Sequence, residues 1–425
     1  MRKILCILAV ICSQYLHAQK TILYCGKLID PKNLQVLQEM SIIVDGNKIV
    51  GVEKGYIKPA TGDKVIHLEK KTVMPGLIDC HVHLEGEIGP DDFVNQFKLN
   101  PQDIAYMSIG FADSTLMAGF TTVRDLGGTG VNISLRNAIN KGLVPGPRVY
   151  TAGIPIGSTG GHNDPTNGLR SDLMGDPGPM QGIVNGVDDC IKAVRQRYKE
   201  GSDVIKIMST GGVLSLEKDG AGAQLTNEEL KAIVAIAKDY GLRVACHAHG
   251  AEGIKRAIRA GVNSIEHGTY MDDEAIQLFK QYGTYYVPTI IAGKSVADSA
   301  KIPGFFPAVI AGKAQAVGPL IQNTFAKAYK AGVKIAFGTD AGVYAHGKNW
   351  KEFVYMTEAG MPPLEAIRAA TVSASDLIGI SDKVGTIEAG KLADIVAVDG
   401  DPVADMNVMG KMCFVMKDGV VYKDK

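Results

Sequence analysis

Hydrophobic residues follow two different patterns along the 425-residue chain, and these patterns divide it. Both ends consist of short β-prone runs that are separated by turns. Near the N-terminus, Ser41–Val44 precedes an Asp45-Gly46-Asn47 turn signal, and near the C-terminus the pair Asp418-Gly419 separates two apolar runs. We therefore expect residues 19–72 and 380–425 to form one small β-sandwich domain that is built from both termini.

The central region alternates strand-like runs with helical patterns. The apolar residues of Asn227–Asp239 share one helical face, and Thr226 and Glu229 form a capping box at its start. Eight strands alternating with helices predict an α/β fold with a (β/α)8 TIM barrel over residues 73–379. A doubly wound parallel sheet is the structural alternative. The predicted strands are Thr72–Cys80, Thr121–Asp125, Arg148–Ala152, Val204–Met208, Arg243–Cys246, Ser264–Glu266, Tyr285–Pro288 and Lys334–Phe337.

The first 18 residues have the three parts of a secretory signal peptide. A basic start, Met1-Arg2-Lys3, precedes the apolar run Ile4–Cys12, and Ala18 supplies a small residue for cleavage. The apolar run is too short to cross a bilayer. Cleavage near Ala18 predicts a periplasmic or secreted protein with no membrane attachment afterwards. A lipoprotein linked through Cys12 and an apolar N-terminal strand are the alternatives.

Composition narrows the class of partner. The 45 basic and 45 acidic residues give a formal net charge of zero, which argues against a nucleic acid or an anionic membrane as partner. Two of the seven cysteines lie within the signal, and the other five are widely spaced. This spacing excludes a disulfide scaffold and a cysteine zinc site. We expect a small-molecule partner, and a homo-oligomer is compatible with the composition.

Polar residues of the kind that bind metals follow or interrupt the predicted strands. His81 and His83 are two residues apart at a strand end, so both imidazoles can face one ion. Lys206 lies within the apolar run Val204–Met208, where a bare ammonium is unfavourable unless it is paired or neutralised. Carbamylation by CO2 would convert it into an anionic metal bridge, whereas a buried salt bridge or an edge strand is the structural alternative.

Three further polar residues end other strands of the same series. His247 and His267 follow two successive strands, and Asp340 follows the last one. Each alone is commonly structural, since a histidine can be satisfied locally and an aspartate can cap a helix. Together with the residues above, however, they end five different strands. A barrel brings such strand ends to one centre, whereas a doubly wound sheet spreads them along a line. The chemistry therefore favours the barrel.

With these residues the chain resembles the amidohydrolase superfamily in its binuclear carboxylated-lysine form. The resemblance rests on Pro75-Gly-Leu-Ile-Asp-Cys-His-Val-His, on Gly338-Thr-Asp-Ala-Gly and on Val384-Gly-Thr-Ile-Glu-Ala-Gly-Lys-Leu-Ala-Asp-Ile-Val. Lys206-Ile-Met-Ser-Thr-Gly-Gly-Val, His247-Ala-His-Gly and Ile265-Glu-His-Gly are similar to the imidazolonepropionase-related group. That group contains secreted Xaa-Pro and Xaa-Arg/Lys dipeptidases and ochratoxinase-like amidases.

The resemblance implies a ligand set for two divalent metal ions, expected to be zinc. His81 and His83 would hold the first ion, His247 and His267 the second, and a carbamate on Lys206 would bridge them. Asp340 would bind the first ion together with the bridging hydroxide. It would then act as the general base and acid.

Three residues are predicted to contact the substrate. His249 lies two residues beyond His247 and is expected to face the substrate rather than the metal. His162 follows Gly160-Gly161 and would bind an α-carboxylate or the oxyanion, unless neighbouring backbone holds it in a structural role. Arg170 lies in the same glycine- and proline-rich loop, where a carboxylate-binding role competes with plain solvation. His346 lies farther from the strand ends and is a weaker candidate.

The resulting hypothesis is a secreted binuclear zinc amidohydrolase that cleaves dipeptides or N-acyl amino acids. A lactonase, phosphotriesterase or cyclic-amide hydrolase would use the same metal site, because loops set the substrate. A mononuclear deaminase has no use for a bridging carbamate, which argues against it. A non-catalytic metal-binding protein would be expected to lack a ligand or the base, and Lys206 and Asp340 are both present.

Overall fold

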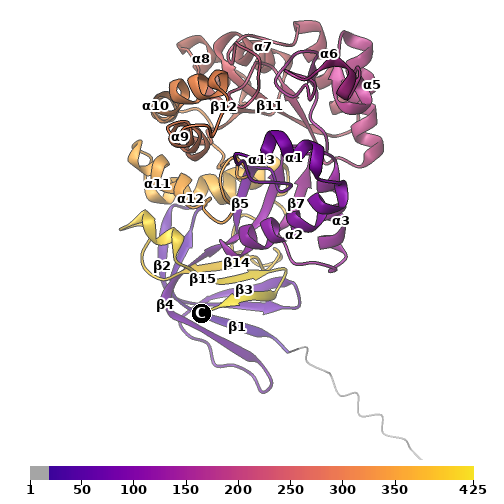
Figure 1. The fold of residues 1–425 in the computed structure, drawn as a ribbon. Coiled ribbons are helices and arrows are strands. Elements are labelled where there is room, and N and C mark those ends of the chain that lie inside the picture. Colours follow the sequence, from indigo (N-terminus) through magenta and orange to yellow (C-terminus); the bar gives the residue numbers. More distant parts are fainter. Residues whose placement is uncertain (1–18) are drawn as a thin grey trace, which may run out of the picture.

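The computed structural model describes residues 19–425, and the predicted signal peptide, residues 1–18, lies outside the described residues. The chain forms a strand-rich part from both of its ends and a larger part in which helices surround parallel strands (Figure 1). No helix among residues 19–425 is long and apolar enough to cross a membrane.

Strands from both ends of the chain form one seven-stranded sheet, in the order β16-β15-β14-β4-β1-β2-β3. Its strands are β1 (Thr21–Asp30), β2 (Gln35–Asp45), β3 (Lys48–Lys54), β4 (Lys64–Pro75), β14 (Ile395–Val398), β15 (Met412–Lys417) and β16 (Val420–Asp424). The pairing of β14 with β4 joins the two ends. Both predicted hairpins form, with β2 pairing antiparallel to β3 and β15 to β16. Since all seven strands are hydrogen-bonded into one sheet, the two-layer sandwich stays a prediction.

The core of this sheet draws on both of its halves. Ile49 of β3 and Phe414 of β15 belong to the same buried apolar cluster, although their strands are far apart in the sheet order. The sheet must therefore bend to enclose its own core. Arg148, at the start of β7, ties it to the rest of the molecule through ion pairs with Asp394 (2.8 Å) and Asp418 (2.5 Å).

The central region contains parallel strands in two main groups, β5-β6-β7 and β10-β11-β12-β13. Their bounds are β5 (Leu77–Val82), β6 (Phe120–Asp125), β7 (Arg148–Thr151), β10 (Val204–Met208), β11 (Arg243–Gly250), β12 (Ser264–Tyr270) and β13 (Tyr285–Val287). The predicted strand Thr72–Cys80 is divided at Gly76 between β4 and β5. A Cβ at Gly76 would lie 2.2 Å from Thr121 Oγ1, so only glycine allows the close approach at this break.

Backbone hydrogen bonds link the two groups on both sides. Ile156 bonds to Lys206 and Met208 of β10, at 2.9 Å each. On the other side, Ala336 N donates to Tyr286 O of β13, and Cys80 N of β5 donates to Phe337 O. The predicted last strand, Lys334–Phe337, thus lies between β13 and β5.

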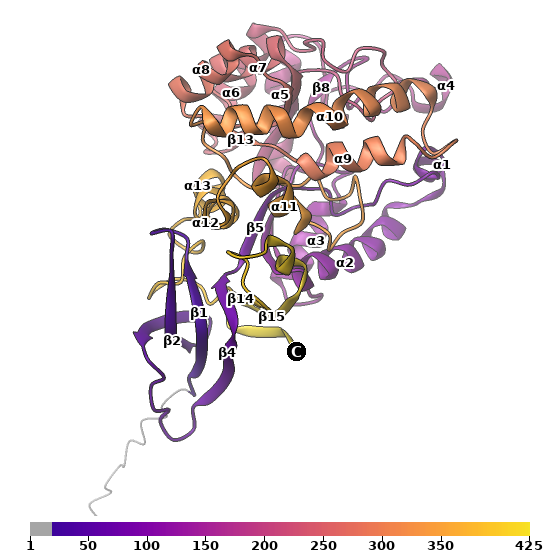
Figure 2. The ribbon, with the colours of Figure 1, turned by 90° about the vertical axis from the view of Figure 1, so that its left-hand side faces the viewer.

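Helices cover the outside of these strands (Figures 1 and 2). They are α1 (Asp92–Lys98), α2 (Pro101–Met117), α3 (Val131–Asn140), α4 (Ser171–Met174), α5 (Val187–Glu200), α6 (Asn227–Asp239), α7 (Ala251–Ala260), α8 (Asp273–Tyr282), α9 (Ile290–Ser299), α10 (Ala308–Lys330), α11 (Lys351–Glu358), α12 (Pro363–Arg368) and α13 (Ala374–Ile378). Helix α6 has the predicted bounds, and its capping box is confirmed by reciprocal bonds between Thr226 and Glu229. Short strands β8 (Gly157–Ser158) and β9 (Ile183–Val184) lie in the loop after β7.

Candidate metal centre

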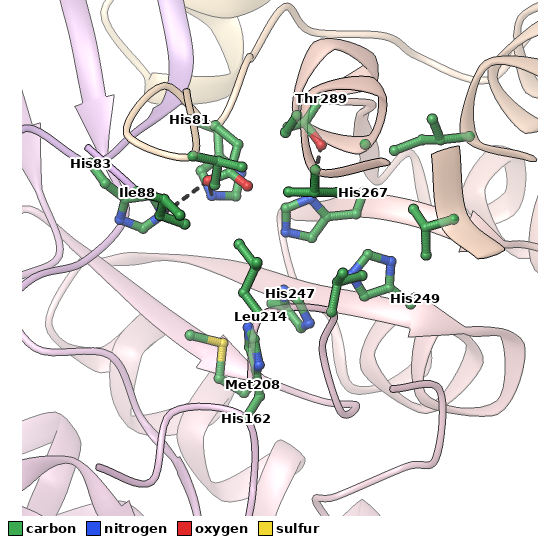
Figure 3. Close-up of a pocket in the computed structure, with 18 of the residues that line it drawn as sticks. His81, His83, Ile88, His162, Met208, Leu214, His247, His249, His267 and Thr289 are labelled. Atoms are coloured by element: carbon green, nitrogen blue, oxygen red, sulfur yellow. Dashed lines mark hydrogen bonds and ion pairs between the residues drawn. The ribbon is translucent and has the colours of Figure 1, made fainter. Parts of the chain in front are cut away.

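One pocket collects all of the sequence-predicted site residues except Arg170 and the weaker candidate His346. These residues are His81, His83, His162, Lys206, His247, His249, His267 and Asp340. They come from the ends of β5, β10, β11 and β12, from the segment after Phe337 and from the loop after β8. In Figure 3, His81 and His83 lie on one side of the pocket, His267 and His249 on the other, and His247 and His162 below them. The strand ends therefore converge.

Asp79 holds the two chain segments that carry His81 and Asp340. Its buried carboxylate accepts hydrogen bonds from the backbone N–H of His81 and of Thr339, both at 3.1 Å, and from Thr339 Oγ1 at 2.6 Å. Asp340 N in turn donates to His81 O at 2.7 Å. Burial raises the pKa of Asp79 to about 7 although these bonds oppose it. The contacts of the Asp79 carboxyl group thus position the segments that carry His81 and Asp340.

Three site residues other than glycine have left-handed backbone: His267 (φ 71°), Thr289 (φ 51°) and Asp340 (φ 60°). Such conformations cost about 1–3 kcal/mol each and persist where the surroundings enforce them. Glu352 of α11 is part of that enforcement, because its buried carboxylate accepts the N–H groups of Ile290 and Ile291 directly after Thr289. Two of the strained residues, His267 and Asp340, are thus ones whose imidazole and carboxylate line the pocket.

Each ligand-type imidazole is oriented by a hydrogen bond on its far side. His83 Nδ1 contacts Gly127 O (2.7 Å), His247 Nε2 contacts Gly211 O (3.1 Å), His249 Nδ1 contacts Thr269 Oγ1 (2.8 Å), and His267 Nδ1 contacts Thr289 Oγ1 (2.8 Å). A carbonyl can only accept, so the contacting nitrogens of His83 and His247 carry the proton. The other nitrogen of His247 presents a lone pair, as metal ligation requires. His83 Nε2 instead faces Asp340 Oδ1 at 3.1 Å, and although burial alone would lower the pKa of His83, this hydrogen bond and the charge of Asp340 raise it.

The electrostatics of the pocket keep most of these imidazoles neutral. Burial, and then the charge of Lys206, holds the pKa of His81 well below its usual value. Burial together with neighbouring histidines does the same for His247 and His267, and lowers the pKa of His249 to about 3. One ligand atom from each of His81, His267 and Asp340 lies within 4.8 Å of the others, and the same holds for His247, His249 and His267. The donor set fits divalent ions.

Lys206 lies between the two histidine groups. Its Nζ is buried and lies 3.4 Å from His81 Nε2. Among the side chains that the structure describes, no carboxylate oxygen lies within 4.0 Å of this ammonium, which argues against the buried salt bridge as an explanation. Burial lowers the pKa of Lys206 to about 8, although Glu266 opposes the shift. A lysine in this state has access to the neutral amine that reaction with CO2 requires.

Asp340 is the carboxylate of the pocket. Its Oδ1 lies 3.1 Å from His83 Nε2 and 3.4 Å from His81 Nε2. Burial would raise its pKa, but His81, His83 and Lys206 together hold the pKa below its usual range. The group is therefore ionised at neutral pH and can accept a proton.

His162 lies against the histidine cluster and is held by the loop after β10. Its ring stacks on that of His247 with 4.2 Å between centroids, and its Nδ1 lies 2.6 Å from Ser215 Oγ. Ser215 Oγ donates to Glu217 Oε1, also at 2.6 Å. Burial and the charge of Lys206 lower the pKa of His162 to about 3, so the ring is neutral.

Arg170 and His346 do not join the pocket. Arg170 is 74% exposed and pairs with Asp172 at 2.6 Å, so the solvated alternative describes it and the carboxylate-binding role finds no support. His346 stacks on Phe111 and contacts Thr115 and Gly86, which gives it a structural role.

Residues 72–422 match the family model described as the amidohydrolase family. This chain belongs to the amidohydrolase family. The predicted resemblance is thereby confirmed, and this amidohydrolase is a hydrolase that acts on amide bonds.

Similar proteins whose names state an activity match between 79% and 96% of this amidohydrolase. A solved structure of a Xaa-Pro dipeptidase with methionine bound in its active site is 53% identical, with a TM-score of 0.93 over 95% of this chain and 100% of that one. A prolidase solved with N-methylphosphonate-L-proline is 32% identical, with a TM-score of 0.88 over 96% of this chain and 100% of that one. Ochratoxinase of Aspergillus niger is 33% identical over 358 residues, 79% of this chain and 73% of the fungal enzyme.

Several residues that shape the pocket carry no local sequence signal. Ser215 and Glu217 hold His162, and Lys313 of α10 holds their loop. Lys313 Nζ donates to the carbonyls of Gly212 (2.7 Å), Ser215 (2.7 Å) and Glu217 (2.9 Å). These contacts join residues about a hundred positions apart, so no local pattern predicts them.

We expect Lys313→Met in this amidohydrolase to loosen residues 211–222. Each lost bond from a charged donor is worth about 1.5–3 kcal/mol, so backbone amides of the loop should exchange at least about tenfold faster. Hydrogen exchange followed by mass spectrometry measures this. Lys301→Met is the matched control, because Lys301 is exposed and forms an ion pair with Asp298, near the end of α9. Equal exchange in both variants would contradict the role of Lys313.

Proposed function

We propose that this amidohydrolase is a secreted binuclear zinc dipeptidase that removes an apolar C-terminal residue, proline included, from dipeptides or N-acyl amino acids. The observation that carries the proposal is the convergence of buried neutral imidazoles, one lysine and one aspartate in a single pocket. The 53% identity to a Xaa-Pro dipeptidase over almost the whole chain supports the reaction class. Secretion rests on the sequence of residues 1–18.

The proposal includes a closed (β/α)8 barrel. The bonds from Ile156 to β10 and from Lys334–Phe337 to β13 and β5 support closure, because they continue the parallel series in a ring. In such a barrel the carboxyl ends of the strands share one rim, where active sites of this fold lie.

His81 and His83 would hold one zinc ion and His247 and His267 the other, with a carbamate on Lys206 between them. The orientation of these imidazoles by polar contacts and the central position of Lys206 Nζ support this assignment. His249 offers a further nitrogen next to His247 and His267. When bound, the two ions would lower the pKa of a coordinated water and polarise the scissile carbonyl.

The residues of the chain would manage the proton and the solvent. Asp340 is ionised and lies at the rim beside His83, so it would take a proton from the attacking water and pass it to the departing amine nitrogen. His162 and His249, both neutral, would orient polar groups of the substrate. The apolar wall described below would exclude bulk water.

The lining of the pocket supports an apolar substrate side chain. Its apolar wall is formed by Val213 and Leu214 of the loop after β10, Val296 of α9, Ile321 of α10 and Val343, and all of these except Ile321 pack together. Apart from Lys206 and Asp340, which belong to the proposed metal site, none of the lining residues that the structure describes is an acid or a strong base. An arginine or lysine side chain would therefore enter without a counter-ion, which costs several kcal/mol.

The Xaa-Arg/Lys alternative would need the carboxylates of the adjoining cavity, Glu85 and Glu87. Both oxygens of Glu85 already accept backbone N–H groups, from Thr129 and Asn132, and Glu87 accepts that of His346. Glu85 is thus engaged through both oxygens and Glu87 through Oε1, which favours the apolar substrate. Lactones, phosphotriesters and cyclic amides would use the same metal site, so only a comparison of hydrolysis rates distinguishes these substrates from dipeptides.

A substrate panel on the zinc-loaded mature enzyme tests the proposal. Xaa-Pro and Xaa-Met dipeptides and N-acyl derivatives of apolar amino acids should be hydrolysed at least tenfold faster, by kcat/KM, than Xaa-Arg or Xaa-Lys. Metal analysis should find about two ions per chain, by the logic of two-metal sites. Removing them with a chelator should abolish hydrolysis. One ion or none, or a preference for lactones or phosphotriesters, would refute the proposal.

Lys206→Ala should abolish turnover, because the carbamate bridge is lost, and short carboxylates such as acetate should restore part of it. The enlarged space then admits a carboxylate in place of the carbamate. Steady-state rates with increasing acetate measure the rescue. Unchanged turnover without acetate would rule out a carbamate at this position.

Asp340→Asn should keep most of the bound metal but lower kcat by about 10²–10⁴-fold, because an amide cannot accept the proton. Metal content and kcat are measured on the same preparation. Acetate should give no recovery here, in contrast to Lys206→Ala. Wild-type turnover in this variant would require another base.

A further inference from the structure

His81 differs from the other pocket histidines in the partner of its far nitrogen. Its Nδ1 lies 3.1 Å from Glu266 Oε2, whereas its Nε2 faces Lys206 and Asp340 at 3.4 Å each. The far nitrogens of the other described pocket histidines contact carbonyls or hydroxyls. Among these described rings, His81 is thus the one whose far nitrogen lies within hydrogen-bond distance of a carboxylate.

Glu266 is itself held on its other side. Its Oε1 accepts a hydrogen bond from Arg124 Nη2 at 2.9 Å and another from Ser264 Oγ. Arg124 also donates to Cys80 O of β5 at 2.6 Å and to Ser264 Oγ at 3.1 Å. Glu266 is 0% exposed and Arg124 2% exposed, so water cannot replace any of these contacts. Both charges are fully committed to their partners.

We propose that Glu266, held by Arg124, is a positioning residue that keeps the His81 proton on Nδ1, so that Nε2 presents its lone pair to the metal ion. The proposal rests on the metal site assigned under the proposed function. An ionised carboxylate only accepts, so its bond to Nδ1 requires a proton there. A carboxylate behind a ligating imidazole also makes that imidazole a stronger ligand.

The number of hydrogen-bond acceptors that residue 266 offers distinguishes this positioning role from that of a purely structural ion pair. Glutamine at position 266 has one accepting oxygen, and Arg124 can only donate, so Arg124 and Ser264 would retain that oxygen. The amide NH2 would then face His81 Nδ1. The ring would have to accept there and carry its proton on Nε2, the nitrogen that faces the pocket. Glutamine and glutamate are similar in size, yet this substitution would move the ring proton of His81 from Nδ1 to Nε2.

Zinc binding to the chelator-treated mature chain tests this. In competition with a chromophoric chelator, Glu266→Gln should bind the first zinc about 10–100-fold more weakly than wild type. Glu229→Gln, which alters the capping box of α6 away from the pocket, is the matched control and should bind like wild type. Thermal unfolding of each metal-free variant separates lost stability from lost affinity. Wild-type affinity in Glu266→Gln would overturn the proposal.

A double variant tests the tautomer directly. With Arg124→Met added to Glu266→Gln, the amide oxygen is free to accept from His81 Nδ1, and its NH2 can bond to Ser264 Oγ. Zinc affinity should recover by at least tenfold over Glu266→Gln alone. A folded double variant with no recovery would overturn the proposal.

If the double variant does not fold, ¹⁵N spectra of the histidine rings in metal-free Glu266→Gln show which nitrogen of His81 carries the proton. The His81 signals are assigned by comparison with the spectrum of His81→Asn. A proton on Nε2 supports the proposal, and a proton on Nδ1 overturns it. Failure of the wild-type chain to bind zinc at all would instead refute the proposed function.

Discussion

Asp79 connects the first strand of the central region with the segment that carries Asp340, and the pocket depends on that connection. Its buried carboxylate accepts the backbone of His81 and both the backbone and hydroxyl of Thr339. His81 belongs to β5, and Thr339 directly precedes Asp340. Asp79 and Thr339 are 260 residues apart in sequence. Together with the backbone bonds from Asp340 N to His81 O and from His83 N to Ala341 O, this connection sets the common position of His81, His83 and Asp340.

Burial then determines the protonation of the groups that the connection brings together. Removal from water keeps His81, His247 and His267 neutral and lowers the pKa of Lys206, while the surrounding positive groups keep Asp340 ionised. These shifts all have the direction that a centre of neutral nitrogen ligands, a reactive amine and a basic carboxylate requires. The apolar lining of Val213, Leu214 and their neighbours contributes to this burial.

Polar contacts from behind give the ring nitrogens their orientation. Thr269 and Thr289 hold His249 and His267, whereas Glu266 with Arg124 holds His81. The loop after β10 holds His162 through Ser215, and that loop depends on Lys313 of a distant helix. Orientation is thus supplied by several elements, so changes outside the pocket can alter the centre.

The sequence by itself determined the local elements and the family. Alternating and helical periodicities predict strands such as Val204–Met208 and the helix Asn227–Asp239, and turn chemistry predicts both hairpins. The spacing of His81 and His83 predicts that they face the same way, because side chains two apart on a strand share a face. These features depend on neighbours in the chain, which a sequence displays directly.

Only the tertiary structure decided how distant segments meet. It placed Arg170 in solvent rather than in the pocket, united the terminal strands in a single sheet, and put Glu266 and Arg124 behind His81. Ile265-Glu-His-Gly displays Glu266 beside a histidine, yet nothing in that motif indicates that its partner is the imidazole of β5. Such contacts follow from strand register and from burial, which the packing of the whole chain sets.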